Sequence, residues 1–157
     1  QAFKIARKQN ITTVLNPAPA IELPKSLLEL TDIIIPNETE AELLTGISIN
    51  NESDMKETAT YFLDLGISAV LITLGEQGTY CAYQEQYKMI PACNVKAIDT
   101  TAAGDTFIGA FLSELNKDLS NLESAIRLAN QASSLTVQRK GAQASIPTRK
   151  EVEAEYN

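Results

Sequence analysis

The segment Ala69-Val70-Leu71-Ile72-Thr73-Leu74 decides the fold class of this 157-residue chain. It is a continuous apolar run of strand length, which is typical of a strand buried on both faces of a parallel sheet. A helical pattern over residues 55–65 precedes it and ends at Gly66, a residue type that often closes helices. A helix followed by a buried strand indicates an α/β protein.

The same alternation extends to both sides of this strand. The other predicted strands cover residues 12–15, 32–35, 79–83 and 87–90. The other predicted helices cover residues 2–9, 37–44, 106–115, 122–137 and a short stretch after Thr148, and the second of them stops at Gly46. Repeated β-α units predict a mostly parallel sheet with helices on both faces, in which ligands bind beyond the carboxyl ends of the strands.

The composition predicts one globular domain over residues 1–157. Apolar residues make up 44% and charged residues 21%, and the net charge is −7. The basic residues form no cluster apart from Arg139-Lys140, which argues against nucleic acid as a partner. No apolar run is long enough to span a membrane, and no signal peptide opens the chain. Cys81 and Cys93 match no metal or redox spacing and read as reduced thiols of a cytoplasmic protein.

The sequence contains no histidine. This excludes Ser-His-Asp and Cys-His catalysis and any histidine-ligated zinc. Acid–base chemistry is therefore left to carboxylates, lysines or tyrosines. The chain also lacks the Gly-x-x-x-x-Gly-Lys-Ser/Thr pattern, so nucleotide binding would not use a P-loop.

The segment Asp99-Thr100-Thr101-Ala102-Ala103-Gly104-Asp105-Thr106-Phe107 runs directly into an amphipathic helical pattern. Its small side chains let an anion approach the backbone, and the N–H groups and dipole of a helix N-terminus bind anions. Asp105, in the first turn, is placed to take a proton from a hydroxyl that attacks a phosphoryl group. The alternative is that the aspartate only caps the helix and Ala-Ala-Gly only packs tightly.

This segment resembles the signature of the ribokinase family of sugar kinases, also called the PfkB family. In that family an Ala-Ala-Gly-Asp or Gly-Ala-Gly-Asp turn forms an anion hole. The resemblance implies that Asp105 is the catalytic base and contacts the substrate. It also implies that N–H groups around Ala102, Ala103 and Gly104 neutralise charge on the transferred phosphoryl group of ATP. It covers the chain from Ala2 to the end and includes Asn16-Pro17-Ala18-Pro19-Ala20, which is given no chemical role.

A second segment, Pro36-Asn37-Glu38-Thr39-Glu40-Ala41-Glu42, follows a predicted buried strand. On local grounds it is a capping box, with Asn37 as the N-cap and Glu40 bonding back to it. In the ribokinase family an Asn-x-x-Glu motif in this context helps to place magnesium and phosphate. The resemblance assigns Asn37 to phosphate or its water shell, and Glu40 to Mg²⁺ through water.

The segment Thr73-Leu74-Gly75-Glu76-Gln77-Gly78 turns through two glycines at the end of a strand. A lone Gly-x-x-Gly pattern is more often a turn than a site. In its place along the chain it resembles the family's nucleotide loop, with Thr73 and the backbone of Gly75, Glu76, Gln77 and Gly78 near ATP. The resemblance also places Asn130 against the adenine, and the alternative is a solvated helix residue.

The segment Val137-Gln138-Arg139-Lys140-Gly141-Ala142-Gln143-Ala144-Ser145 follows the longest predicted helix. As a helix end, it places basic residues near the negative pole of the dipole, followed by Gly141. The resemblance implies instead a K⁺ site made by loop carbonyls and side-chain oxygens. Its ligands would be the Asp99 carboxylate, the Ser145 hydroxyl and the carbonyls of Thr101, Thr136, Arg139 and Gly141.

The resemblance corresponds to the C-terminal half of a ribokinase. It implies an ATP-dependent kinase for D-ribose, with Mg²⁺ and K⁺ as cofactors, that dimerises through a lid outside these residues. The tetrad Lys140-Gly141-Ala142-Gln143 is more like ribokinases than fructokinases or adenosine kinases. Two alternatives stay open: a nucleotide-binding fragment without turnover, and a kinase of fructose, another sugar or a nucleoside.

Overall fold

The computed structural model describes residues 1–156, which divide into two compact units. Unit 1 comprises residues 1–74 and 80–89. Unit 2 comprises residues 75–79 and the described residues from Ile90 onward. No helix among the described residues is both long enough and apolar enough to cross a membrane.

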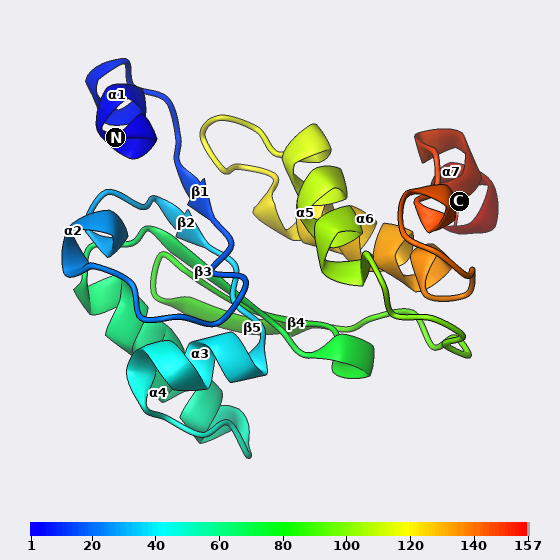
Figure 1. Cartoon of the computed structure of the whole chain (residues 1–157), viewed down its shortest axis with the longest axis horizontal. Coiled ribbons are helices and arrows are strands. Elements are labelled where there is room, and N and C mark those ends of the chain that lie inside the picture. Colours follow the sequence, from blue (N-terminus) through cyan, green and yellow to red (C-terminus); the bar gives the residue numbers. More distant parts are fainter. Residues whose placement is uncertain (157) are drawn as a thin grey trace. The chain divides into compact units, whose positions relative to one another are not determined.

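Unit 1 holds almost all of a five-stranded sheet with the order β1-β2-β3-β4-β5 (Figure 1). The strands are β1 (Val14–Leu15), β2 (Ile33–Ile34), β3 (Ala69–Thr73), β4 (Thr79–Tyr83) and β5 (Gln86–Ile90). The helices of this unit are α1 (Ala2–Lys8), α2 (Lys25–Leu28), α3 (Glu38–Thr45) and α4 (Glu52–Asp64). All the strands predicted from the sequence are present, whereas the short helix α2 was not predicted.

The sheet is mixed, which corrects the prediction of a mostly parallel one. Strands β1, β2 and β3 are parallel, with Val14 opposite Ile33 and Ile33 opposite Ala69. The connections from β3 to β4 and from β4 to β5 are too short for a parallel crossover, which needs a dozen or more residues. Both of these pairs are therefore antiparallel, and β4 and β5 form the predicted hairpin.

The core of unit 1 lies between the sheet and its helices. Helices α3 and α4 pack on β3, and Phe62, Val70 and Ile72 are fully buried in this layer. Burying such a side chain contributes roughly 1.5–3 kcal/mol. Helix α4 begins three residues before its predicted start because Asn51 caps it, accepting a hydrogen bond from the Asp54 N–H at 3.2 Å. As predicted, Gly46 ends α3 in the left-handed conformation (φ 74°).

Unit 2 is built around the packed pair α5 (Ala103–Glu114) and α6 (Leu122–Thr136), with α7 (Arg149–Tyr156) packed on α6 (Figure 1). Two short 3₁₀ turns, η1 (Gly75–Gln77) and η2 (Gln143–Ser145), complete it. Phe107 and Phe111 are buried on α5 with their rings stacked, the centroids 6.3 Å apart. These helices match the predicted ones, except that α5 begins three residues earlier.

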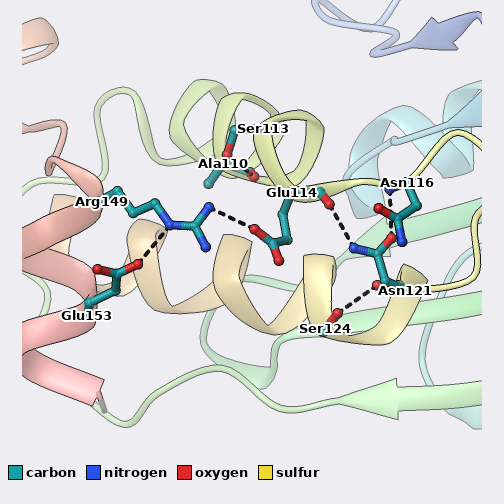
Figure 2. A network of polar contacts seen from close by, with 8 residues as sticks. All are labelled: Ala110, Ser113, Glu114, Asn116, Asn121, Ser124, Arg149 and Glu153. Atoms are coloured by element: carbon teal, nitrogen blue, oxygen red, sulfur yellow. Dashed lines mark hydrogen bonds and ion pairs between the residues drawn. The ribbon is translucent and has the colours of Figure 1, made fainter.

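The C-terminal end of α5 is fixed by a polar network (Figure 2). Arg149 of α7 pairs with Glu114 of α5 and with Glu153 on its own helix, each at 2.8 Å. The Asn121 amide donates to the Glu114 carbonyl at 2.7 Å, and its oxygen accepts the Asn116 N–H at 2.7 Å. These bonds hold the turn between α5 and α6. The candidate site lies at the other, N-terminal end of α5.

Candidate active site

In unit 1 the segment after β2 forms the predicted capping box. The Asn37 side chain accepts the Glu40 N–H at 2.8 Å, and Glu40 Oε2 accepts the Asn37 N–H at 2.8 Å. The local interpretation is therefore confirmed as geometry. Glu40 is buried, yet its second carboxylate oxygen, Oε1, has no hydrogen-bond partner among residues 1–156. The cap thus leaves one oxygen of Glu40 for a further ligand.

The structure brings Thr73 next to this cap. Thr73 ends β3 and forms a parallel bridge with Asn37, and its N–H donates to the Pro36 carbonyl at 2.9 Å. The carboxyl ends of β2 and β3 therefore place Asn37, Glu40 and Thr73 at one edge of unit 1. Among the described residues no three Cys, Asp or Glu side chains gather as a metal cluster.

In unit 2 the two-glycine turn is tightly folded. Gly75 and Gly78 have φ values of 55° and 110°, and the Gly78 N–H donates to the Gly75 carbonyl at 3.2 Å. A Cβ atom at Gly78 would lie 2.2 Å from the Ile90 carbonyl oxygen, so only glycine fits there. Glu76 and Gln77 project to the surface between the two glycines. The turn exposes residues 75–77, while Gly78 is buried against the backbone of residues 90–92.

Asn130 is buried, so the alternative of a solvated helix residue is wrong. Its side-chain oxygen accepts the Thr79 hydroxyl at 2.9 Å. Its amide nitrogen lies within hydrogen-bond distance of the carbonyls of Ile90 (3.0 Å) and Pro91 (3.2 Å). Asn130 therefore anchors the start of β4 and the end of β5 to α6, and its assignment to adenine stays a prediction.

The N-terminal end of α5 carries the predicted anion-binding turn. Ala102 is its N-cap in the left-handed conformation (φ 63°), and no side chain caps the helix. The interpretation of the aspartate as a helix cap is therefore wrong. The Ala103 N–H donates to the Thr100 carbonyl at 3.2 Å, whereas the N–H groups of Ala102, Gly104 and Asp105 have no acceptor among the described residues. Donors free of partners at a helix N-terminus bind anions.

Asp105 lies in the first turn of α5 with its side chain exposed. It borders a cavity of about 280 Å³ within unit 2, between α5, α6 and the start of α7. Gly109 and Ala110 line the cavity on α5, and Leu128 lines it on α6. The carboxylate is therefore open to solvent, beside the free N–H groups of its own helix turn.

The two loops predicted to bind K⁺ meet at Asp99. Its carboxylate accepts the Gly141 N–H at 3.0 Å and the Thr101 N–H at 2.9 Å. The bond from Gly141, and then the hydrogen bonds from Thr101, lower the pKa of Asp99 to about 2. The Val137 carbonyl accepts the N–H groups of Ile98 (2.7 Å) and Asp99 (3.1 Å). The carboxylate is thus ionised and joins the two loops.

The oxygen atoms around this junction suit a weakly hydrated cation. Among residues 1–156, the carbonyls of Thr101, Arg139 and Gly141 accept no hydrogen bond. The Thr136 carbonyl accepts the Arg139 N–H at 3.0 Å. The buried Ser145 hydroxyl donates to the Ala142 carbonyl at 2.6 Å and keeps lone pairs for a ligand. Arg139 pairs with Glu151 at 2.8 Å.

Comparison with known proteins places this site in a family. A model of the pfkB family carbohydrate kinases matches residues 1–149. The chain belongs to the pfkB family. It is 64% identical over 151 residues, 96% of the chain, to a ribokinase of Staphylococcus aureus (strain COL). It covers 50% of that relative and spans about half the length of the relatives it matches.

Solved ribokinase structures share the fold of this pfkB-family chain. Ribokinase from Arabidopsis thaliana, solved in complex with ribose and ATP, superposes with a TM-score of 0.91 at 33% identity. The match covers 98% of this chain and 50% of that one. Ribokinase from Thermotoga maritima superposes with a TM-score of 0.86 at 36% identity, over 98% and 51% of the two chains.

Sequence reasoning missed two hydroxyls that support the pfkB-family turn. Ser133 on α6 donates to the Ala103 carbonyl at 2.9 Å, and Thr136 donates to the buried Thr106 hydroxyl at 3.1 Å. A usable signal was present, because Ala129, Ala132, Ser133 and Thr136 place small side chains at helical spacing along one face of α6. Such a face allows a second helix to approach closely.

Proposed function

We propose that the whole protein is an ATP-dependent carbohydrate kinase that phosphorylates D-ribose at O5 to give D-ribose 5-phosphate. The observation that carries the proposal is the start of α5. There the exposed Asp105 carboxylate lies in the same helix turn as the free N–H groups of Ala102, Gly104 and Asp105. A base beside anion-binding donors is the arrangement that phosphoryl transfer to a hydroxyl requires.

In this mechanism Asp105 removes the proton from the 5-hydroxyl of ribose. The sugar oxygen forms a bond to the γ-phosphorus of ATP, and the bond from that phosphorus to the leaving ADP oxygen breaks. The N–H groups around Ala102, Ala103 and Gly104, of which those of Ala102 and Gly104 are free, would stabilise the negative charge on the transferred group. Catalysis of this kind depends mainly on positioning and electrostatics.

Asn37, Glu40 and Thr73 are proposed to act on the phosphates of ATP. Asn37 would contact phosphate or its water shell, and Glu40 would hold Mg²⁺ through water by its free oxygen Oε1. Bound Mg²⁺ neutralises phosphate charge. The backbone of the turn from Gly75 through Glu76 and Gln77 to Gly78 would lie along the nucleotide, with Asn130 near the adenine.

K⁺ is proposed to bind where Asp99 joins the two loops. The carboxylate of Asp99, the hydroxyl of Ser145 and the free carbonyls fit a cation that is held by dipoles. The proposed carbonyl ligands are the free carbonyls of Thr101, Arg139 and Gly141 and that of Thr136, which also accepts the Arg139 N–H. The cation would then support the turn that carries the free N–H groups without contacting the substrate.

The remaining expectations belong to the same proposal. Residues 1–157 would belong to one ribokinase-like domain. The whole protein would be a cytoplasmic homodimer, with ribose and ATP as ligands and neither nucleic acid nor membrane as a partner. The identity to the Staphylococcus aureus ribokinase and the tetrad Lys140-Gly141-Ala142-Gln143 support ribose as the sugar.

A second candidate is a nucleotide-binding fragment without turnover. The observation in its favour is that these residues span about half the length of their relatives. A kinase of fructose, another sugar or a nucleoside is the third candidate, supported by a family model that names carbohydrate kinases in general.

The test is ADP formation with Mg²⁺ by the whole protein, and by these 157 residues alone, in KCl and in choline chloride. Ribose-dependent turnover by the whole protein that needs K⁺ supports the proposal, and turnover only with fructose or a nucleoside supports the third candidate. We expect Asp105→Asn to lower turnover by at least ~10²-fold, the lower limit for general-base assistance. Near-normal turnover by this variant would remove Asp105 from the mechanism.

A further inference from the structure

Two hydroxyl groups on α6 hold the N-terminal turn of α5. The Ser133 hydroxyl donates to the carbonyl of Ala103, the first residue of α5, at 2.9 Å. The Thr136 hydroxyl donates to the Thr106 hydroxyl at 3.1 Å, and both of these side chains are buried. Each contact joins residues 30 positions apart. The start of α5 is therefore tied to a different helix and does not depend on a cap of its own.

The residues before the turn are tied to the same end of α6. The carbonyl of Val137, the C-cap of α6, accepts the N–H groups of Ile98 at 2.7 Å and Asp99 at 3.1 Å. Val137 thus holds the turn at its beginning, and Ser133 holds it at its end. The segment between these two attachments contains Thr100, Thr101 and Ala102.

This double attachment explains the backbone conformation of Ala102. Its φ of 63° is left-handed, which costs an L-residue roughly 1–2 kcal/mol. Strained residues persist where the surrounding structure holds them in place. Because no side chain caps the start of α5, the attachments to α6 hold Ala102 in the left-handed conformation. Of the two attachments, the bond from Ser133 lies nearer to Ala102 in the sequence, because its acceptor Ala103 directly follows Ala102.

We infer that Ser133 is a positioning residue for the free N–H groups of Ala102, Gly104 and Asp105. The inference rests on the proposed function, because it assumes that these groups stabilise the transferred phosphoryl group. Without the hydroxyl, Ala102 relaxes toward ordinary φ values and the N–H groups turn from their places. Because these N–H groups act on the transferred group in the transition state, this change lowers kcat and leaves the KM for ribose and ATP in place.

The experiment compares steady-state kinetics of the whole wild-type protein with three variants. For Ser133→Ala we expect kcat to fall about tenfold. This is the effect of losing one hydrogen bond from a free N–H group to the transferred phosphoryl group in the transition state. Both KM values should stay within about twofold of wild type. Ser133→Thr retains a hydroxyl and should recover most of kcat. Ser124→Ala is the matched control, since Ser124 lies at the other end of α6 and donates to the Asn121 carbonyl at 2.9 Å.

Two kinetic outcomes would overturn the inference. One is a kcat for Ser133→Ala within about twofold of an active wild type, well short of the expected effect. The other is an equal fall in Ser124→Ala, which would indicate a general effect on α6. If the wild-type protein has no ribose-dependent turnover, the proposed function fails.

In that case amide hydrogen exchange, which does not depend on turnover, tests whether Ser133 holds the turn. Amide hydrogen exchange of Ala103 and Thr106, whose N–H groups donate to the Thr100 and Ala102 carbonyls, should be faster in Ser133→Ala than in wild type, with exchange in the α4 core unchanged. Unaltered exchange at these amides would overturn the inference. The same measurement on Ser133→Thr, which should resemble wild type, applies if the alanine variant does not fold.

Discussion

The carboxylate of Asp99 accepts the backbone N–H of Gly141 at 3.0 Å, across 42 residues of the chain. This bond joins the loop that precedes α5 to the loop that follows α6. It is also the largest cause of the low pKa of Asp99, about 2 against an ordinary value of 3.8. One hydrogen bond therefore links the proposed cation site to the turn with the free N–H groups.

The pH dependence of stability should report this bond. The pKa of Asp99 is lower in the folded state, so its contribution is present above about pH 4 and is lost as the pH falls toward 2. Asp99→Asn should lower the thermal midpoint by a few degrees at pH 7. The difference from wild type should shrink between pH 4 and 2, as followed by circular dichroism. A difference that is constant over this range would contradict the assignment.

The left-handed conformation of Ala102 predicts that two substitutions there differ in their effect on stability. Ala102→Gly should leave stability within about 1 kcal/mol of wild type, because glycine relieves the strain but adds entropy to the unfolded chain. Ala102→Val should destabilise by more than about 1 kcal/mol, because a β-branched residue is a strong outlier at positive φ. Urea denaturation measures both. Equal stabilities of the two variants would show that Ala102 is not strained.

Gly78 should not tolerate a side chain. A Cβ atom there would lie 2.2 Å from the Ile90 carbonyl oxygen and 2.6 Å from the Ala92 nitrogen, both backbone atoms. Gly78→Ala should therefore destabilise by more than about 3 kcal/mol, beyond the usual range for overpacking. Gly109→Ala is the control, because its Cβ meets nothing within 4 Å and alanine favours a helix by about 0.5–1 kcal/mol. Urea denaturation of both variants should show opposite signs.

The buried amide of Asn130 predicts a loss of stability on truncation. Asn130→Ala leaves the Thr79 hydroxyl and the Ile90 carbonyl without their partner. Each buried polar group left unsatisfied costs about 1–3 kcal/mol, so the two groups together cost roughly 2–6 kcal/mol. Gln131→Ala, at the next position of α6, should change stability by less than about 0.5 kcal/mol. An equal effect of both substitutions in thermal denaturation would contradict the structural role of Asn130.

Much of the fold followed from local patterns. The apolar run of β3, the closing glycines Gly46 and Gly66 and the capping box of Asn37 and Glu40 were all predicted, because each depends on residues within one or two turns. The starts of α4 and α5 were predicted three residues late. In α5 no side chain caps the helix, so no capping residue marked its first position in the sequence.

The chemistry of the candidate site was likewise suggested by residue types close together in the chain. The run from Asp99 to Asp105 combines small residues and a carboxylate at the start of a helix, and this was legible from the sequence alone. The sequence alone also indicated the family, which the match over residues 1–149 confirmed. The specific roles of these residues remain proposals.

Only the tertiary structure decided which distant groups support that site. The bond from Gly141 to Asp99 spans 42 residues, the contact from Ser133 to Ala103 spans 30, and Asn130 reaches Thr79 across 51. Such bonds depend on how helices and loops pack. The sequence around one residue does not show which distant residue it will contact. Caps and periodicity are local and therefore readable in sequence, whereas the closure of the site is set by packing between elements.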